Sequence, residues 1–454
     1  MRVCVCALAL VCGGSLWAQR VGERARRHLA DLIRLETVNP PGNETLAARY
    51  LERVAREEGI ACELLGSDPD RLNFVARLPG SGKRRPLLLM AHTDVVPAER
   101  AQWSVDPFAG LVRDGRIYGR GAQDDKGLLA AELAVLVELK RRGVTLERDV
   151  ILMAEADEEA GSTGIQWLIA NAWPKIQAEF ALNEGGTIAQ FASGTRIYQV
   201  QTAEKIPTRA VLRARGTAGH ASLPRADNPV LAVARALVNL ADADQPVSLN
   251  STTRRYFAAL AKVKEYRWLA PLLPRLANAR TAVMAANEIR WREPELDAQL
   301  RTTVAPTMLR AGVKINMIPN AAEAEVDIRR LPDETAAEVF ARLRRLVNDS
   351  AVEVLPAPGQ EMPATEPSAT DTALYRAMEK AFLAATPGAL VVPCMQRGAT
   401  DAAFLRAKGM QVYGVPLFQR DDDADRAHGN DERISLANLE AGTELLWNIV
   451  TTVR

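Results

Sequence analysis

The chain has 454 residues, of which 48% are hydrophobic and 25% are charged, and its formal net charge is +1. This length predicts two or three domains, or one large domain with an insertion, and the composition is that of a soluble globular protein with a large core. The nearly neutral charge gives no support for a nucleic-acid partner or an anionic membrane surface.

The first residues differ from the rest. Arg2 is followed by an uncharged run from Val3 to Ala18, which at 16 residues is shorter than the roughly 20 that a membrane-spanning helix needs. One positive charge before an apolar run that ends in a small residue is typical of a secretory signal. We therefore expect residues 1–18 to be cleaved near Ala18 and the protein to be exported, to the periplasm or outside the cell. An uncleaved N-terminal anchor is the alternative.

Five cysteines are present, and three of them precede Ala18. Cys62 and Cys394 remain after cleavage. Two cysteines do not make a disulfide framework, even in an oxidising compartment. We expect two buried free thiols, with a single bridge between them as the alternative.

The first half of the chain alternates helices and strands. Pro86–Ala91 is a continuous apolar run, as expected of a strand that is buried on both faces. Strands that alternate with helices indicate an α/β layer fold. The expected order is a helix, a Pro-rich turn and a helix within 20–58, strands at 62–65, 73–78 and 86–91, a helix at 128–142, and strands at 149–155 and 179–182.

Near residue 205 the pattern changes to that of a small α+β domain. We expect strands at 208–214, 314–318 and 322–329 and helices at 228–240 and 336–347. Residues 249–311 between them read as mostly helical, either as packing or as a lid over a pocket. The first pattern then returns, with helices at 370–385, 401–407 and 435–452 and strands at 388–392 and 411–414. The expected domains are thus a catalytic domain built from 19–205 and 355–454 and an inserted domain at 206–354.

Three of the four histidines lie in short motifs that suit chemistry. His92 and Asp94, in Met90-Ala-His-Thr-Asp94, follow a buried strand two residues apart, so that both side chains point to one face. A histidine ligand is usually held through its other ring nitrogen, and Asp94 is a natural partner for it. His428 lies in a polar loop before the last helix.

Acidic residues also occupy strand ends and loops. Asp124, in Gly119-Arg-Gly-Ala-Gln-Asp-Asp-Lys-Gly127, either bridges two cations or caps the helix that follows. In Asp157-Glu-Glu-Ala-Gly161, one of Glu158 and Glu159 suits metal binding and the other suits proton transfer. Glu184 also follows a strand. Two histidines and several carboxylates form the ligand set of a carboxylate-rich zinc site, although manganese or cobalt would fit as well.

The other two histidines have different contexts. His220, in Gly216-Thr-Ala-Gly-His-Ala-Ser222, lies in the expected inserted domain and could donate a hydrogen bond to a developing oxyanion. A helix-start or surface position is the alternative. His28, within Arg26-Arg27-His28, is expected to be exposed.

From about residue 27 to the C-terminus the chain resembles the co-catalytic dinuclear zinc peptidase family of aminoacylase, glutamate carboxypeptidase, acetylornithine deacetylase and succinyl-diaminopimelate desuccinylase. Besides the motifs above, Asn316-Met-Ile-Pro319 and His428-Gly-Asn-Asp-Glu-Arg433 carry the resemblance. The long insert and Leu182-Asn-Glu-Gly-Gly186 are most similar to the branch of carboxypeptidase S and secreted N-acyl-amino-acid hydrolases.

The resemblance implies a three-layer α/β catalytic domain with a ferredoxin-like α+β lid or dimerisation domain inserted into it. It implies that His92, Asp124 and Glu184 hold one zinc ion, and that Asp124, Glu159 and His428 hold the second. Glu158 would be the general base and then the acid, Asp94 would orient His92, and His220 would reach an active site, often that of a partner subunit. The implied residues for the substrate are Arg329 and Asn316, which meet its carboxylate, and Gly398 and Thr400, which line the pocket.

Two positions depart from the family pattern. Asn183 stands where relatives of this branch often carry Asp, and we favour Glu184 over Asn183 as the metal ligand. Gln123 before the bridging Asp124 is unusual and is expected to face away from the metals.

The expected activity is hydrolysis of an amide bond next to a free carboxylate, in a small peptide or an N-acyl amino acid. A deacylase or desuccinylase of a small acylated metabolite is the near alternative. An extracytoplasmic protein that binds metal or ligand without catalysis is an alternative from another class, and the presence of both Glu158 and Glu159 argues against it. A homodimer through the inserted domain is implied by the resemblance alone.

Overall fold

A computed structural model describes residues 8–358, 362–419 and 426–454. Its internal contacts divide the chain into two compact units. The first consists of the chain up to Thr202, Ser368–Val392 and Thr400–Arg454, and the second of Ala203–Pro367 and Pro393–Ala399. The expected inserted domain, 206–354, lies within the second unit.

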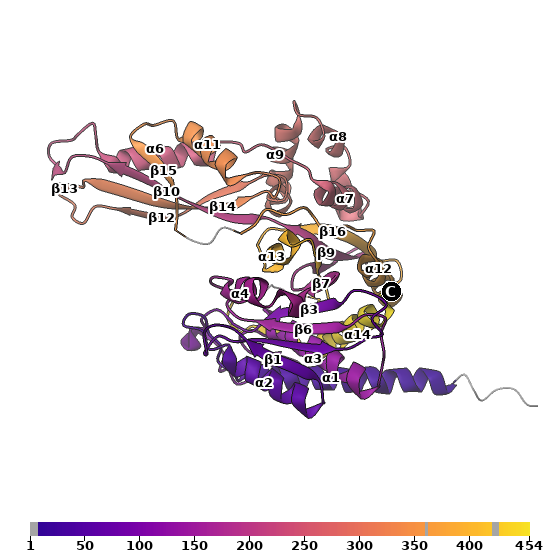
Figure 1. The fold of residues 1–454 in the computed structure, drawn as a ribbon. Coiled ribbons are helices and arrows are strands. Elements are labelled where there is room, and N and C mark those ends of the chain that lie inside the picture. Colours follow the sequence, from indigo (N-terminus) through magenta and orange to yellow (C-terminus); the bar gives the residue numbers. More distant parts are fainter. Residues whose placement is uncertain (1–7, 359–361, 420–425) are drawn as a thin grey trace, which may run out of the picture. The chain divides into compact units, whose positions relative to one another are not determined.

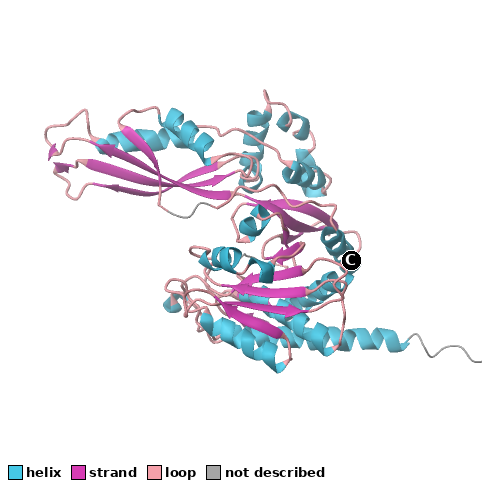
Figure 2. Ribbon diagram, in the orientation of Figure 1, coloured by secondary structure: helices cyan, strands magenta, loops and turns pink. Residues whose placement is uncertain are grey.

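The first unit is built on a mixed nine-stranded sheet (Figures 1 and 2). Its four central strands, β6, β3, β7 and β17, are parallel to one another. The flanking pairs whose register the structure gives, β1–β2, β2–β6, β17–β9 and β8–β9, are antiparallel. The spatial order is β1(Ala61–Leu65), β2(Asn73–Leu78), β6(Val150–Glu155), β3(Leu87–His92), β7(Phe180–Asn183), β17(Gln411–Gly414), β9(Arg196–Glu204) and β16(Leu390–Gln396), with β8(Thr187–Gln190) beside β9.

Helices cover both faces of this sheet, because successive strand residues point to opposite faces. In β3, Leu87, Leu89 and Ala91 pack into the larger apolar cluster, whereas Leu88 and Met90 pack into the smaller one. The larger cluster includes residues of α1(Leu8–Ile33), α2(Thr45–Glu57), α3(Lys126–Arg141), α12(Ala373–Ala385) and α14(Leu436–Thr452). The smaller one includes residues of α4(Thr163–Asn171), α5(Trp173–Ile176) and α13(Ala402–Ala407). The expected three-layer α/β architecture is confirmed.

The parallel strands bring distant parts of the sequence to one edge of the sheet. His92 ends β3, the turn after β6 carries Glu158 and Glu159, and Glu184 follows β7. A small three-stranded sheet, β4(Leu111–Arg113), β5(Arg116–Tyr118) and β18(Arg433–Ser435), joins the loop before α3 to the loop that carries His428. Residues that follow the carboxyl ends of parallel strands are the usual site-forming residues of such folds.

The second unit is a four-stranded antiparallel sheet with two helices packed on its buried residues (Figure 1). The chain order β10, α6, β12, β14, α11, β15 combined with the sheet order β12-β14-β10-β15 is that of a ferredoxin-like domain, as expected. Leu212, Val326 and Ile328 of the sheet pack with Val233 and Leu343 of the helices. The element bounds are β10(Ile206–Arg215), α6(Pro229–Asp242), β12(Thr303–Ala311), β14(Ala321–Arg330), α11(Ala336–Val347) and β15(Val352–Pro356).

The insert between α6 and β12 is helical as far as residue 297. It contains α7(Ser251–Leu260), the 3-10 helix η2(Lys264–Leu269), α8(Leu273–Leu276), α9(Ala282–Arg292) and α10(Pro294–Asp297). The prediction was wrong at its end, because 303–311 is strand β12 and not helix. The strand expected at 314–318 is also shorter, because only β13(Met317–Ile318) forms there, paired with β11(Gly219–His220).

Helix α1 begins at Leu8 and continues to Ile33. The expected signal, 1–18, lies partly outside the described residues, since these begin at position 8. Among the helices of the described chain, none combines the length and the apolar character that a membrane span requires. Cys62 and Cys394 are free thiols, of which Cys394 is buried and Cys62 partly buried.

Candidate metal centre and active site

Two imidazoles face one carboxylate at the edge of the central sheet. Nε2 of His92 lies 2.9 Å from Oδ1 of Asp124, and Nε2 of His428 lies 3.2 Å from Oδ2 of the same residue. His92 is buried at the end of β3, Asp124 lies just before α3, and His428 belongs to the loop before β18. The two oxygens of Asp124 therefore face two different histidines, which is the arrangement that a carboxylate bridging two cations requires.

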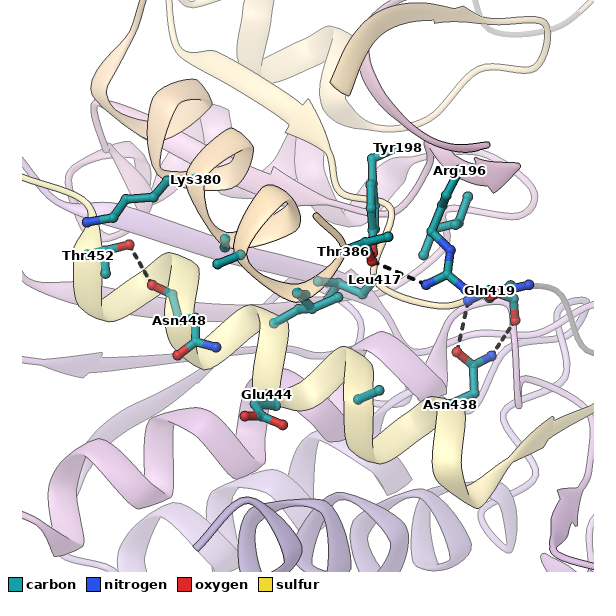
Figure 3. A pocket seen from close by; sticks show the side chains of 16 residues that line it. Arg196, Tyr198, Lys380, Thr386, Leu417, Gln419, Asn438, Glu444, Asn448 and Thr452 are labelled. Carbon is teal, nitrogen blue, oxygen red and sulfur yellow. Dashed lines mark hydrogen bonds between the residues drawn. The ribbon is translucent and has the colours of Figure 1, made fainter. Parts of the chain in front are cut away.

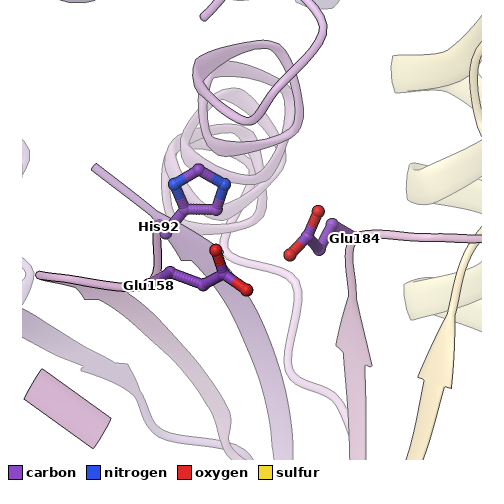
Figure 4. Close-up of side chains that lie close together, drawn as sticks. All are labelled: His92, Glu158 and Glu184. Atoms are coloured by element: carbon purple, nitrogen blue, oxygen red, sulfur yellow. The ribbon is translucent and has the colours of Figure 1, made fainter. Parts of the chain in front are cut away.

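Three glutamates complete the cluster. Oε1 of Glu159 lies 3.2 Å from Nε2 of His428. His92, Asp124 and Glu159 offer ligand atoms that all lie within 4.8 Å of one another, and so do His92, Glu158 and Glu184. Figure 4 shows the second group, in which the carboxylates of Glu158 and Glu184 point toward His92. The structure thus brings together the five predicted metal ligands and the predicted base.

The electrostatics of the cluster favour bound positive charge. Burial, together with the nearby carboxylate of Asp124, raises the pKa of Glu184 to about 8. Burial and Glu184 raise the pKa of Glu158 well above its usual range. Hydrogen bonds to Asp124 and Glu159 raise the pKa of His428 to about 10. Carboxylates this close repel one another unless protons or cations neutralise them.

The donor set fits a pair of divalent cations. Imidazole nitrogens and carboxylate oxygens are the ligands of zinc in hydrolytic sites, and cysteine, which dominates closed structural zinc sites, is missing from the cluster. His92 also has the support that a metal-bound histidine needs, because its Nδ1 lies 3.0 Å from the backbone oxygen of Asp94 and 3.4 Å from the Asp94 carboxylate.

Asp94 holds the turn that carries the two glutamates. Its carboxylate accepts hydrogen bonds from the backbone N–H groups of Glu158, at 3.2 Å, and Glu159, at 3.1 Å. Nδ2 of Asn39 donates both to Asp94, at 2.8 Å, and to Asp157, at 2.9 Å. Asp94 therefore positions the predicted base as well as His92, and Asn39 is a contributor that sequence reasoning missed.

Glu432 is the second contributor that was missed. It is fully buried, and its carboxylate pairs with Arg120 at 2.7 Å. It also accepts hydrogen bonds from the backbone N–H groups of Gly121, Gln123 and Asp124, at 3.0, 2.7 and 3.2 Å. One buried carboxylate thus ties the His428 loop to the Asp124 loop. Its place four residues after His428 in His428-Gly-Asn-Asp-Glu432 was the available signal.

Comparison with known proteins identifies the family of the chain. The model of peptidase family M20/M25/M40 matches residues 88–452. The chain belongs to this family.

Two relatives and one solved structure illustrate the membership. The M20 chain is 30% identical to the N-fatty-acyl-amino acid synthase/hydrolase PM20D1 of Homo sapiens over 81% of this chain and 74% of that protein. It is 27% identical to a probable carboxypeptidase S-like 2 of Dictyostelium discoideum over 81% of this chain and 71% of that protein. The crystal structure of the M20 family metallo-carboxypeptidase Sso-CP2 from Sulfolobus solfataricus shares the fold, with a TM-score of 0.73 at 21% identity over 94% of this chain and 98% of that chain.

The two departures from the family pattern have structural explanations in this M20 metallohydrolase. Asn183, buried at the end of β7, donates from Nδ2 to the hydroxyl of Thr400 at 3.3 Å, whereas Glu184 belongs to the candidate metal cluster. The side chain of Gln123 donates to the backbone oxygen of Arg433 at 2.8 Å. Gln123 thus bonds to the C-terminal loop.

The other predicted residues of this M20 chain, apart from Thr400, belong to its second unit. His220 is exposed in β11, and its Nδ1 lies 2.7 Å from the hydroxyl of Ser222. Asn316 lies beside it, because its backbone oxygen accepts the N–H of Ala221 at 3.1 Å. Arg329, in β14, donates from Nε to Asp327 at 2.9 Å. Gly398 belongs to the same unit.

Proposed function

We propose that this M20 enzyme hydrolyses the amide bond of N-acyl amino acids, next to the free carboxylate, and that C-terminally free dipeptides are its second substrate class. The human relative is named for N-fatty-acyl amino acids and the Dictyostelium relative for carboxypeptidase S, and both kinds of substrate carry an amide next to a carboxylate. The observation that carries the proposal is the Asp124 carboxylate, which offers one oxygen to each of two imidazoles beside Glu158.

In this proposal His92, Asp124 and Glu184 would hold one zinc ion, and Asp124, Glu159 and His428 would hold the second; Mn²⁺ or Co²⁺ would suit the same donors. Bound divalent cations polarise a carbonyl group and lower the pKa of water.

Glu158 is the proton carrier. Its carboxylate accepts a proton from the attacking water and passes it to the nitrogen of the leaving amine, so that one residue serves as base and then as acid. The hydrogen bonds from the backbone N–H groups of Glu158 and Glu159 to Asp94 fix the turn that carries the Glu158 carboxylate.

The substrate carboxylate would be bound by the second unit. Arg329 suits a bidentate pair with a carboxylate, and Asn316 would donate to the same group. Gly398 and Thr400 would line the pocket, and His220 would donate to the oxyanion that develops on the carbonyl oxygen.

A substrate panel tests the proposal. N-acyl amino acids, C-terminally free dipeptides and the methyl esters of both are assayed with the metal-loaded enzyme and after chelation. We expect hydrolysis of the free acids, at least tenfold slower hydrolysis of the methyl esters, and loss of activity after chelation that zinc restores. Equal rates for acids and esters would favour a deacylase of another metabolite. Metal binding without any hydrolysis would favour the alternative of a protein that binds metal or ligand without catalysis.

We also propose that the protein is exported and forms a homodimer through the second unit. Strand β12 ends the order of the four-stranded sheet, and Met308, Leu309 and Ile315 in and beyond it are exposed, Ile315 to 98%. An exposed apolar edge strand invites pairing with a second copy. Light scattering of wild type against Leu309→Lys tests the dimer, and N-terminal sequencing of the mature protein tests cleavage near Ala18. A monomeric wild type, or an intact N-terminus, would contradict the respective proposal.

A further inference from the structure

A cavity opens in the first unit, in the groove between α12 and α14 (Figure 3). Its volume is about 610 Å³, within the range of roughly 300 to 1,000 Å³ that is typical of small-molecule sites. None of the residues that line it belongs to the metal cluster described above. The catalytic proposal therefore leaves it without a role.

Arg196 places a positive charge at one end of this groove. Its guanidinium is held by three neutral acceptors: Nε by the side-chain oxygen of Gln190 at 2.9 Å, one terminal nitrogen by Gln419 at 3.0 Å and the other by the hydroxyl of Thr386 at 3.4 Å. Among the described residues, no carboxylate forms an ion pair with Arg196. Hydrogen bonds thus hold the guanidinium in place, and no described carboxylate pairs with it.

The remaining hydrogens of Arg196 suit a carboxylate. A guanidinium has five N–H donors, and the three bonds above leave one on each terminal nitrogen. Two N–H groups on the two terminal nitrogens match the two oxygens of a carboxylate in a bidentate pair. Tyr198, buried beside Arg196, is fixed by its bond to Thr386 at 2.8 Å and by stacking on Phe382.

The rest of the groove is mainly apolar and elongated. Figure 3 places Arg196, Thr386 and Gln419 at one end and Lys380 and Thr452 at the other. The lining also includes small or apolar side chains from both helices and from the segment before Gln419, namely Ala381, Ala384, Leu417, Ala441 and Leu445, together with the polar side chains of Asn438, Glu444 and Asn448. A linear hydrocarbon chain fits such a lining.

We propose that this groove binds a monocarboxylate amphiphile of the fatty-acid class, with its carboxylate on Arg196 and its chain between α12 and α14. Glu444 also lines the groove, and its negative charge disfavours a polyanion. The site is independent of the metal centre and of the proposed hydrolysis, so a failure of either proposal leaves the other standing.

Equilibrium dialysis of the metal-loaded enzyme with radiolabelled dodecanoate tests the proposal. Arg196→Gln removes the cation, and Ala384→Trp fills the groove from an exposed position without removing a hydrogen bond. Arg84→Gln is the matched control, because Arg84 is an exposed arginine outside the groove. We expect at least tenfold weaker binding in Arg196→Gln and in Ala384→Trp and unchanged binding in Arg84→Gln. Hydrolysis of a short N-acetyl amino acid should be unchanged in all three variants.

Two further ligands separate the head group from the chain. Dodecanol should bind at least tenfold more weakly than dodecanoate, and inorganic phosphate should not displace dodecanoate at equal concentration. Wild-type affinity for dodecanoate in both groove variants would overturn the proposal, as would equal binding of dodecanol. Displacement of dodecanoate by phosphate would identify a simple anion site and would overturn the proposal of an amphiphile site.

Discussion

At the scale of single residues, the site depends on the surroundings of Asp124 and of the turn after β6. Asp124 faces both imidazoles, and Glu158 and Glu159 stand on a turn whose backbone N–H groups are bound by Asp94. Asp124 and Glu159 thus face side chains from other segments of the chain, and the turn that carries Glu158 is held through its backbone. Substitutions can therefore separate proton transfer from metal binding and from positioning.

Replacing the proposed base should remove turnover and leave the metals in place. In Glu158→Gln the side chain keeps its shape but no longer accepts a proton, and we expect kcat to fall by about 10² to 10⁴. Metal content, measured by mass spectrometry, should equal that of wild type. Glu57→Gln, at an exposed helical position, serves as the control. A Glu158→Gln enzyme with wild-type kcat would show that another group carries the proton.

Replacing Asn39 should damage the site without touching a ligand. Its amide is the shared donor of Asp94 and Asp157, so Asn39→Ala leaves two buried carboxylates short of a donor. We expect unfolding free energy to fall by about 1 to 3 kcal/mol, together with a lower kcat. Denaturant unfolding and steady-state kinetics measure both. Asn171→Ala, at an exposed position, should change neither, and an unaffected kcat in Asn39→Ala would argue against a positioning role.

The predicted residues that the structure brings into one cluster are those that lie in a motif. Asp124, Glu158, Glu159 and Glu184 each follow or precede a regular element in a polar, glycine-containing segment, and His92 ends β3 in a His-x-Asp motif, so local sequence was sufficient to select them. Asn39 lies in a Pro-rich loop, where an asparagine is ordinary, and its role arises only when β3 and β6 place Asp94 and Asp157 beside it. No local pattern predicts such a contact.

At the scale of elements, two loops from distant parts of the chain form one half of the site. Strand β18 pairs with β5, and Glu432, just before β18, accepts hydrogen bonds from three N–H groups of the Asp124 loop and from the guanidinium of Arg120. The position of His428 relative to Asp124 therefore depends on one buried carboxylate.

Exchanging this carboxylate for an amide should loosen the pair of loops. In Glu432→Gln one acceptor oxygen becomes a donor that faces N–H groups, and we expect a loss of about 3 kcal/mol of unfolding free energy and weaker retention of metal during dialysis. Glu379→Gln, on the exposed face of α12, is the matched control. If Glu432→Gln retains metal and stability like the control, the proposed link between the loops is wrong.

The contact between α1 and α2 contains a histidine that was expected to be exposed. His28 is instead partly buried, and its Nδ1 lies 2.8 Å from the hydroxyl of Tyr50. Burial, with Arg24 and Arg27 nearby, lowers the pKa of His28 from 6.5 to about 4. Its neutral form is therefore favoured in the folded state.

This shift predicts a stability that falls in acid. Because the unfolded chain binds the proton more readily, the contribution of His28 is complete above pH 6.5 and is lost as the pH falls toward 4. We compare the free energies of unfolding of wild type and His28→Gln at two pH values. Wild type should be on the order of 1 to 2 kcal/mol less stable relative to His28→Gln at pH 5 than at pH 7.5. Denaturant unfolding at both pH values measures this, and a constant difference would refute the shift.

Elements with a clear period were predicted well, and the edge strand β12 was not. The buried strands β3 and β6 and the helices α3, α11 and α14 lie within a few residues of the predicted ranges. Strand β12 was missed because it is largely exposed, contains Pro306 and has an irregular register between Pro306 and Met308. An edge strand tolerates a proline that cannot donate to a neighbour, so its sequence resembles a loop.

At the scale of the whole molecule, the candidate ligands all belong to the first unit, although they come from both ends of the chain. The alternation of patterns along the sequence was sufficient to predict a small α+β domain within an α/β domain. The exact residues of the two units were not predictable, because segments such as 393–399 join the second unit through contacts that have no local signal.

Removal of the metals should therefore lower the local stability of the first unit alone. A ligand that binds only the folded state stabilises the part of the protein that binds it, so chelation should speed amide hydrogen exchange in β3, in the first turn of α3 and in the loop at 426–433. Exchange in β10, β14 and α6 should stay unchanged. Mass spectrometry of exchanged peptides measures this, and uniform acceleration in both units would contradict the assignment of the metals to the first unit alone.

The most direct test of the account is the metal stoichiometry of wild type and Asp124→Asn, measured by mass spectrometry together with kcat. The account predicts two equivalents of divalent metal per chain in wild type, loss of bound metal and of activity in Asp124→Asn, and wild-type values in Asp114→Asn, which alters an exposed aspartate. Two retained equivalents and wild-type kcat in Asp124→Asn would contradict the claim that one carboxylate joins both metal positions.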